Sequence, residues 1–138
     1  MPACGSPVAL WLPVTKRLLI VDDEISILFA LKRYFIRQGY AVDCARELEE
    51  AEALAAHTIY DLVIADLSLS GAGSAEGLEI IRFVRRHNHH ARSIVLTAYG
   101  TPHVEREARR RGANAFLAKP QQVGNIAQLA KRLMEGEL

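Results

Sequence analysis

The strongest constraint on the fold is a regular alternation of short apolar segments with longer stretches of helical periodicity from residue 17 onward. Residues 18–21 and 62–65 are uninterrupted apolar runs of strand length, which is typical of strands buried on both faces of a sheet. Between them, Leu28, Leu31 and Phe35 recur with the spacing of one helical face. Strands that alternate with helices form a parallel sheet covered by helices on both sides. The sequence therefore predicts an α/β sandwich.

Turn and cap residues set the expected boundaries. Gly39 and Gly112 are expected to end helices, because glycine readily adopts the left-handed conformation found there. Thr101 and Pro102 are expected to begin one, as N-cap and first helical residue. The predicted strands are 18–21, 40–45, 62–65, 93–96 and 115–118, and the predicted helices are 25–38, 47–57, 78–87, one from 102 to Gly112, and a closing helix that contains 126–133.

Length and composition indicate one folded domain. Half of the 138 residues are hydrophobic and 24% are charged, which favours a globular chain with a buried core. The net charge of +1 does not indicate a dedicated nucleic-acid binder. Cys4 and Cys44 predict no disulfide framework and favour a cytoplasmic location. Residues 7–14 are far too few for a membrane span of ~20 residues. We expect an N-terminal extension at 1–16 and one domain at 17–138.

Polar residues follow four of the five predicted strands. Asp22 and Asp23 come after the first strand, Asp66 after the third, Thr97 after the fourth and Lys119 after the fifth. Because the carboxyl ends of parallel strands meet at one edge, we expect these side chains to converge there. Two adjacent carboxylates ~4 Å apart repel by about 1 kcal/mol in water and by about 4 kcal/mol at an effective dielectric of 20. A cation between them would remove that cost.

The residue types indicate phosphoryl chemistry with a divalent cation. Carboxylate oxygens suit Mg²⁺, and a carboxylate such as Asp66 can also act as a nucleophile. Lys119 and the hydroxyl of Thr97 would stabilise charge on a transferred phosphoryl group. Taken singly, each residue is more often a helix cap or a solvated surface charge. The joint placement favours the functional interpretation.

Five segments together resemble the receiver domain of bacterial two-component response regulators, over about residues 17–136. The resemblance implies a flavodoxin-like fold: a three-layer doubly wound (βα)5 sandwich with a five-stranded parallel sheet in the order 2-1-3-4-5. It also implies a signalling receiver rather than an enzyme. The segments are LLIVDDE (18–24), YDLVIADLSL (60–69), GLEIIR (77–82), IVLTAYG (94–100) and GANAFLAKP (112–120).

The resemblance assigns roles to the acidic residues. It implies that Asp66 accepts a phosphoryl group from a histidine kinase or a histidine phosphotransfer protein. Mg²⁺ is expected to bind Asp23 and Asp66 directly, Asp22 through water, and the main-chain carbonyl of Ser68. The downstream partner is expected to be a protein rather than nucleic acid or membrane, and the chain to be a monomer or a weak homodimer.

The resemblance also implies a conformational switch. Thr97 matches the switch hydroxyl, Phe116 the switch aromatic, and Lys119 the site lysine. The Lys119–Pro120 bond is expected to be cis, which is feasible only because proline follows. Movement of Thr97 toward the phosphate would let the ring of Phe116 rotate inward and change the surface of the fourth helix, fifth strand and fifth helix. Because phenylalanine lacks a hydroxyl group, the switch is expected to depend on packing alone.

The chain departs from the family pattern near the acceptor. Ser70 stands where proline is common, and the usual glycine appears as Gly77, which predicts a loop after Asp66 about three residues longer than usual. Tyr99 is expected near the path of an attacking water molecule, which predicts slow self-dephosphorylation. Ser68 is a second position expected to tune that rate.

Two other functions stay open on the sequence alone. One is an interaction module with the receiver fold that takes up no phosphate. The other is a phosphohydrolase that uses an aspartyl-phosphate. Such enzymes typically carry Asp-x-Asp, whereas the acids here are adjacent and Glu24 is expected to point into the next helix. The basic runs at 85–92 and 105–112 favour solvated faces over metal, anion or nucleic-acid sites.

Overall fold

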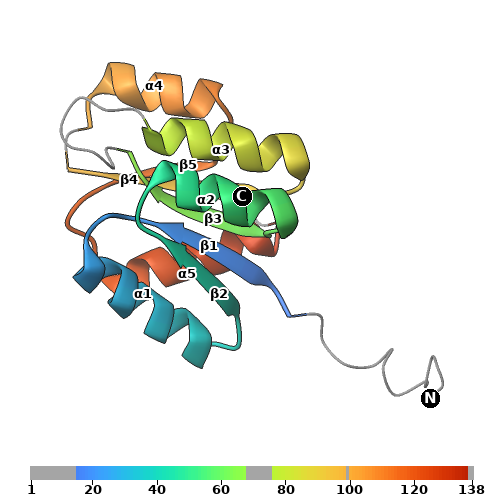
Figure 1. Cartoon of the computed structure of the whole chain (residues 1–138). Coiled ribbons are helices and arrows are strands. Elements are labelled where there is room, and N and C mark those ends of the chain that lie inside the picture. Colours follow the sequence, from blue (N-terminus) through green and yellow to red (C-terminus); the bar gives the residue numbers. More distant parts are fainter. Residues whose placement is uncertain (1–14, 68–75, 99, 137–138) are drawn as a thin grey trace, which may run out of the picture.

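Five parallel strands form a single sheet in the order β2-β1-β3-β4-β5 (Figure 1). The computed structural model describes residues 15–67, 76–98 and 100–136 of the chain. The predicted strand order is confirmed. The strands are β1 (Arg17–Val21), β2 (Ala41–Ala45), β3 (Leu62–Asp66), β4 (Arg92–Thr97) and β5 (Ala115–Ala118).

Helices cover both faces of the sheet, as predicted. Figure 1 shows α1 and α5 on one face and α2, α3 and α4 on the other. The helices are α1 (Ile25–Arg37), α2 (Leu48–His57), α3 (Glu76–His87), α4 (Pro102–Arg110) and α5 (Val123–Met134). None of the helices in the described ranges is long and apolar enough to cross a membrane.

Two hydrophobic clusters, one on each face, explain the uninterrupted apolar strands. In β1, Leu19 and Val21 belong to the cluster beneath α2, α3 and α4, whereas Leu18 and Ile20 belong to the cluster beneath α1 and α5. Successive strand residues point to opposite faces, so a strand that is buried on both sides has apolar residues at every position.

The helix ends agree closely with the cap residues. Gly39 and Gly112 have φ values of +95° and +111°, in the left-handed region that favours glycine. The hydroxyl oxygen of Thr101 accepts a hydrogen bond of 3.2 Å from the main-chain N–H of Val104, which caps α4. The start of α3 at Glu76 is two residues earlier than expected, α4 ends at Arg110, two residues before Gly112, and the other stated boundaries that differ do so by one residue.

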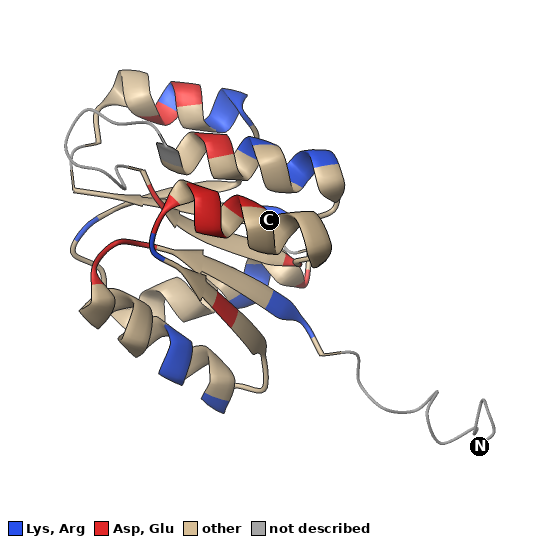
Figure 2. Cartoon of the chain, in the orientation of Figure 1, with Lys and Arg blue, Asp and Glu red and all other residues tan. Residues whose placement is uncertain are grey.

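α4 is the helix with the smallest buried face. Ala108 is its buried residue, Val104 is partly buried against the same cluster, and most of its other residues are charged. Ion pairs link Arg109 to Glu105 and Arg111 to Glu79 of α3, each at 3.0 Å. Figure 2 shows the basic residues of α3 and α4 gathered toward one end of each helix, where cations interact favourably with the helix dipole.

The expectations for the N-terminal extension concern residues that are mostly not described. Cys4 and residues 7–14 lie outside the described ranges. Cys44 lies in β2 and is half-buried, and burial raises the pKa of its thiol.

Candidate functional site

Three carboxylates gather at the carboxyl edge of the sheet. One oxygen from each of Asp22, Asp23 and Asp66 lies within 4.8 Å of the others. Asp22 and Asp66 are buried, whereas Asp23 is exposed. The adjacent strands β1 and β3 position them, because Val21 pairs with Ala65 and the acids follow directly. Strand order therefore brings together acids that are distant in the sequence.

The ammonium group of Lys119 faces these carboxylates. Its Nζ lies 2.8 Å from Oδ2 of Asp22, 3.5 Å from Oδ2 of Asp66 and 3.2 Å from Oε1 of Glu24. The main-chain N–H of Lys119 donates a hydrogen bond of 2.8 Å to the carbonyl oxygen of Thr97, which fixes the base of the side chain. Only 11% of the Lys119 side chain is exposed, so its ion pairs with the buried Asp22 and Asp66 are shielded from water, whereas Glu24 is exposed. Lys119 thus connects β5 to the acids after β1 and β3.

Burial and pairing act differently on the two ends of this ion pair. Burial raises the pKa of Asp22, and the hydrogen bonds from Lys119 and from the main-chain N–H of Glu24 only partly offset that effect. Burial alone would lower the pKa of Lys119, but its hydrogen bond to Asp22 and the charges of Asp22 and Asp66 outweigh burial, so the pKa is raised. Lys119 is therefore a fixed positive charge, while ionised Asp22 carries a desolvation cost that a further cation would reduce.

Thr97 and Phe116 lie on the paired strands β4 and β5. Thr97 is buried at the end of β4, opposite Ala118. Phe116 is half-buried and packs against the cluster beneath α2, α3 and α4. The ring of Phe116 and the methyl group of Thr97 both lie close to Gly100. The two proposed switch residues therefore share one neighbour in the loop between β4 and α4.

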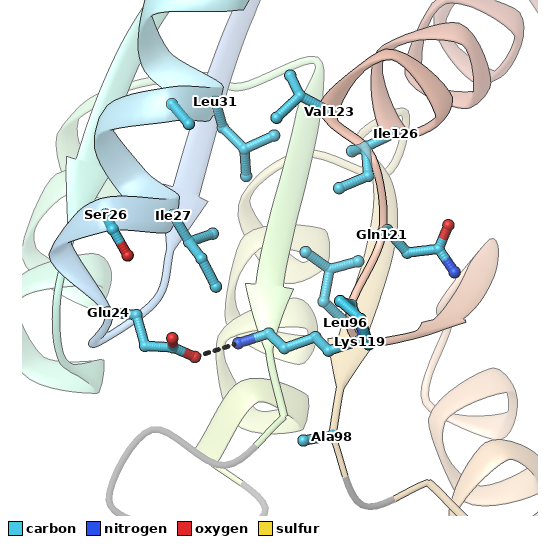
Figure 3. Close-up of a pocket in the computed structure, with 12 residues that line it drawn as sticks. Glu24, Ser26, Ile27, Leu31, Leu96, Ala98, Lys119, Gln121, Val123 and Ile126 are labelled. Carbon is cyan, nitrogen blue, oxygen red and sulfur yellow. Dashed lines mark hydrogen bonds and ion pairs between the residues drawn. The ribbon is translucent and has the colours of Figure 1, made fainter.

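Glu24 corrects one expectation from the sequence. The prediction that Glu24 points into the following helix is wrong, because its carboxylate contacts Lys119 (Figure 3). Glu24 is the N-cap residue of α1 but makes no side-chain cap hydrogen bond.

The Lys119–Pro120 peptide bond is cis, as expected from the sequence. The roles expected for Ser68 and Tyr99 concern residues outside the described ranges.

Gly77 is a site residue whose steric role was missed. A Cβ atom at this position would collide with the main-chain carbonyl oxygen of Asp66 and would lie 2.8 Å from Cα of Leu67. The N–H of Gly77 also donates a hydrogen bond of 3.1 Å to the carbonyl oxygen of Leu67. The start of α3 therefore rests directly on the main chain of Asp66. The only signal for this role in the sequence was the glycine at position 77, from which we predicted only a longer loop after Asp66.

A cavity of about 410 Å³ opens beside Lys119, between α1 and α5. Figure 3 shows Ile27 and Leu31 of α1 facing Val123 and Ile126 of α5 across it. Lys119 and Glu24 line the end of this cavity next to the three carboxylates. The polar site thus borders an apolar groove.

Comparison with known proteins agrees with this geometry. Residues 18–131 match the family model described as response regulator receiver domain. The chain is 28% identical over 121 residues to sporulation initiation phosphotransferase F of Bacillus subtilis (strain 168), covering 88% of this chain and 95% of that one. It is 36% identical over 111 residues to the acid tolerance regulatory protein ActR of Sinorhizobium medicae (strain WSM419), where it covers 80% of this chain but only 56% of the relative.

Solved structures show the same fold. A CheY-like receiver domain protein from Methanospirillum hungatei JF-1 aligns with a TM-score of 0.81 at 24% identity, covering 89% of this chain and 96% of that one. A response regulator protein from Burkholderia pseudomallei, with a phosphorylated aspartic acid, a calcium ion and citrate, aligns with a TM-score of 0.75 at 34% identity. The alignment covers 88% of this chain and 71% of that one. The match to the family model covers most of the chain, so this protein belongs to the response regulator receiver domain family.

Proposed function

We propose that Asp66 accepts a phosphoryl group from a phosphohistidine of a histidine kinase or phosphotransfer protein. The observation that carries this proposal is the placement of Asp66 beside both the ammonium of Lys119, at 3.5 Å, and two further carboxylates. A lone acceptor carboxylate would repel an incoming phosphoryl group, whereas a fixed ammonium compensates that repulsion. The phosphorylated aspartic acid in the Burkholderia pseudomallei structure supports the same assignment.

In the transfer, a carboxylate oxygen of Asp66 forms a bond to phosphorus. The bond between phosphorus and the donor's imidazole nitrogen breaks, its electron pair stays on that nitrogen, and the imidazole takes a proton from solvent. Lys119 holds a positive charge against the phosphoryl oxygens, as is usual where charge develops in phosphoryl transfer. We also infer that the hydroxyl group of Thr97, at the end of the neighbouring strand, donates a hydrogen bond to the acyl phosphate.

The donor set of this site fits Mg²⁺. Asp22, Asp23 and Asp66 offer oxygen ligands within one small volume, and Mg²⁺ is commonly held by one or two carboxylates together with waters and phosphate oxygens. When bound, the ion would neutralise charge on the phosphoryl group and on the three acids. We include the main-chain carbonyl of Ser68 as a fourth ligand, on the family resemblance alone.

We infer that phosphorylation acts through Thr97 and Phe116 on a protein partner. Movement of Thr97 toward the phosphate would change the packing of the half-buried Phe116 ring beside it. Phe116 lies on β5, so the affected surface is that of α4, β5 and α5. A downstream protein that docks there would sense phosphorylation by packing alone.

Turnover of a phosphate ester is not proposed, because the acids Asp22 and Asp23 are adjacent and Glu24 is paired with Lys119.

The surface next to the acceptor supports docking of the phosphodonor over α1. Ile25 and Phe29 are 60% and 59% exposed, lie about one turn apart at the start of this helix and line the same surface hollow, and adjoining exposed apolar side chains are typical of interaction surfaces. A donor must bring its phosphohistidine to the edge where Asp66 lies, and α1 begins just after Asp22 and Asp23. An apolar surface on the donor would therefore cover Ile25 and Phe29 during transfer.

Incubation with Mg²⁺ and acetyl phosphate should add one phosphoryl group to the wild-type chain and none to Asp66→Ala. Asp43→Asn provides a matched control, since this carboxylate lies outside the cluster, paired with Arg17. The mass of the intact protein measures uptake. A phosphoryl gain in Asp66→Ala would contradict the assignment of the acceptor. No gain in the wild type would favour an interaction module that takes up no phosphate.

Mg²⁺ should raise the unfolding temperature of the wild-type chain, and Asp23→Asn should lose most of that increase. An ion that binds only the folded state stabilises it by about 2.7 kcal/mol at 100 times its Kd. Protons compete with the ion, and burial raises the pKa of Asp22, so the increase should fade on acidification at a higher pH than ordinary aspartates would give. Thermal denaturation at constant ionic strength tests this, with Asp43→Asn as control. An equal increase in Asp23→Asn would place the ion elsewhere.

A further inference from the structure

The space around Gly100 is filled by the two proposed switch residues. A Cβ atom at position 100 would lie 2.9 Å from Cε1 and 3.1 Å from Cζ of Phe116, and 3.0 Å from Cγ2 of Thr97. Ordinary van der Waals contact begins at 3.4 Å. The ring and the methyl group therefore occupy the volume that the side chain of any other residue would need.

Gly100 is not required by the conformation of its own main chain. The described glycines with positive φ are Gly39, Gly112 and Gly136, so Gly100 adopts a conformation open to other residues. The reason for a glycine at this position is thus steric and comes from its neighbours. This distinguishes Gly100 from the glycines that end helices.

The main chain on both sides of Gly100 is anchored. On one side, Thr97 pairs with Ala118 and its carbonyl oxygen accepts the N–H of Lys119 at 2.8 Å. On the other side, Thr101 caps α4 through its bond to Val104, and its carbonyl oxygen accepts the N–H of Glu105 at 2.9 Å. The nearest atoms to a side chain at position 100 belong to the Phe116 ring, so we expect that ring to move to accommodate it.

We propose that Gly100 is the positioning residue of the switch: by lacking a side chain, it admits the ring of Phe116 to the place beside Thr97. A methyl group at position 100 closes that place and displaces the ring from it, whether or not Asp66 is phosphorylated. The signalling role of Gly100 rests on the proposed function. The steric conflict between a side chain at position 100 and the Phe116 ring is a property of the unphosphorylated chain and does not depend on that function.

Gly100→Ala tests the proposal, with Gly124→Ala as the matched control. Gly124 lies in α5, has no positive φ, and a Cβ atom there would meet nothing within 4 Å. The full chain is labelled with 4-fluorophenylalanine, and the ¹⁹F signal of Phe116 is identified by its loss in Phe116→Leu. We expect this signal to move in Gly100→Ala before any phosphodonor is added and to stay in place in Gly124→Ala.

The same spectra separate this proposal from the proposed function. With acetyl phosphate and Mg²⁺, Gly100→Ala should gain one phosphoryl group as the wild type does, while the phosphorylation-dependent shift of the Phe116 signal falls at least fivefold. A Phe116 signal in Gly100→Ala that matches the wild type would overturn the positioning role. Failure of the wild type to take up phosphate would instead count against the proposed function and leave the ring displacement standing.

A double-mutant cycle keeps the test decisive if Gly100→Ala folds poorly. If the ring is the obstacle, removing it in Phe116→Ala should abolish most of the loss in urea midpoint caused by Gly100→Ala. The double variant should then unfold at nearly the midpoint of Phe116→Ala alone. An equal loss in both backgrounds, or a double variant that does not fold while Phe116→Ala does, would overturn the proposal.

Discussion

Lys119→Met should slow phosphoryl uptake by ~10²-fold to 10³-fold while leaving Mg²⁺ binding as tight as in the wild type or tighter. The slowing is expected because the ammonium of Lys119, 3.5 Å from Oδ2 of Asp66, is positioned against the charge of the transferring group. The effect on the metal has the opposite sign. Removing a cation that lies 2.8 Å from Asp22 leaves three carboxylates without their paired charge, which favours a divalent ion.

Lys131→Met is the matched control, since Lys131 is an exposed lysine of α5. The rate of mass gain from acetyl phosphate measures transfer, and calorimetric titration measures Mg²⁺ affinity. Equal losses of transfer and of Mg²⁺ affinity in Lys119→Met would show that the variant has disrupted the site as a whole. An unchanged transfer rate would remove Lys119 from the proposed chemistry.

Gly77→Ala should destabilise the fold by about 1–3 kcal/mol and also impair phosphoryl uptake. The added Cβ atom would collide with the main-chain carbonyl oxygen of Asp66 and lie 2.8 Å from Cα of Leu67. Main-chain atoms at the end of a central strand cannot rotate away as the end of a side chain can. Either α3 moves outward or the acceptor aspartate is displaced from its neighbours, and both outcomes alter the site.

Urea denaturation and the acetyl phosphate assay measure the two effects of Gly77→Ala. Gly124→Ala is again the control, and it should be neutral or slightly stabilising, because alanine favours a helix by about 1 kcal/mol over glycine. Wild-type stability together with wild-type uptake in Gly77→Ala would show that α3 does not need to rest on the acceptor strand.

The fold could be predicted because its determinants are local. The apolar run at residues 18–21 and the one-sided spacing of Leu28, Leu31 and Phe35 specify their elements without knowledge of the rest of the chain. Parallel topology then follows from the alternation of strands and helices.

The candidate site was only partly accessible from the sequence. The ends of strands indicate which side chains share an edge, so the gathering of Asp22, Asp66 and Lys119 could be anticipated. The orientation of Glu24 could not, because it depends on a lysine 95 positions away. The steric role of Gly100 depends on distances between elements. No local pattern contains those distances.

Because α4 buries little apolar surface, only a small free energy is needed to move it relative to the sheet. Burial contributes about 0.8 kcal/mol for each methyl or methylene group, and α4 buries only Ala108 and part of Val104, so moving it costs far less than moving a helix that buries leucine and phenylalanine. The ion pairs of α4, such as Arg109 with Glu105, are exposed and weak. If Asp66 takes up a phosphoryl group as proposed, we therefore expect α4 to be the helix that reorients while the two cores stay intact, and added salt should make that reorientation easier.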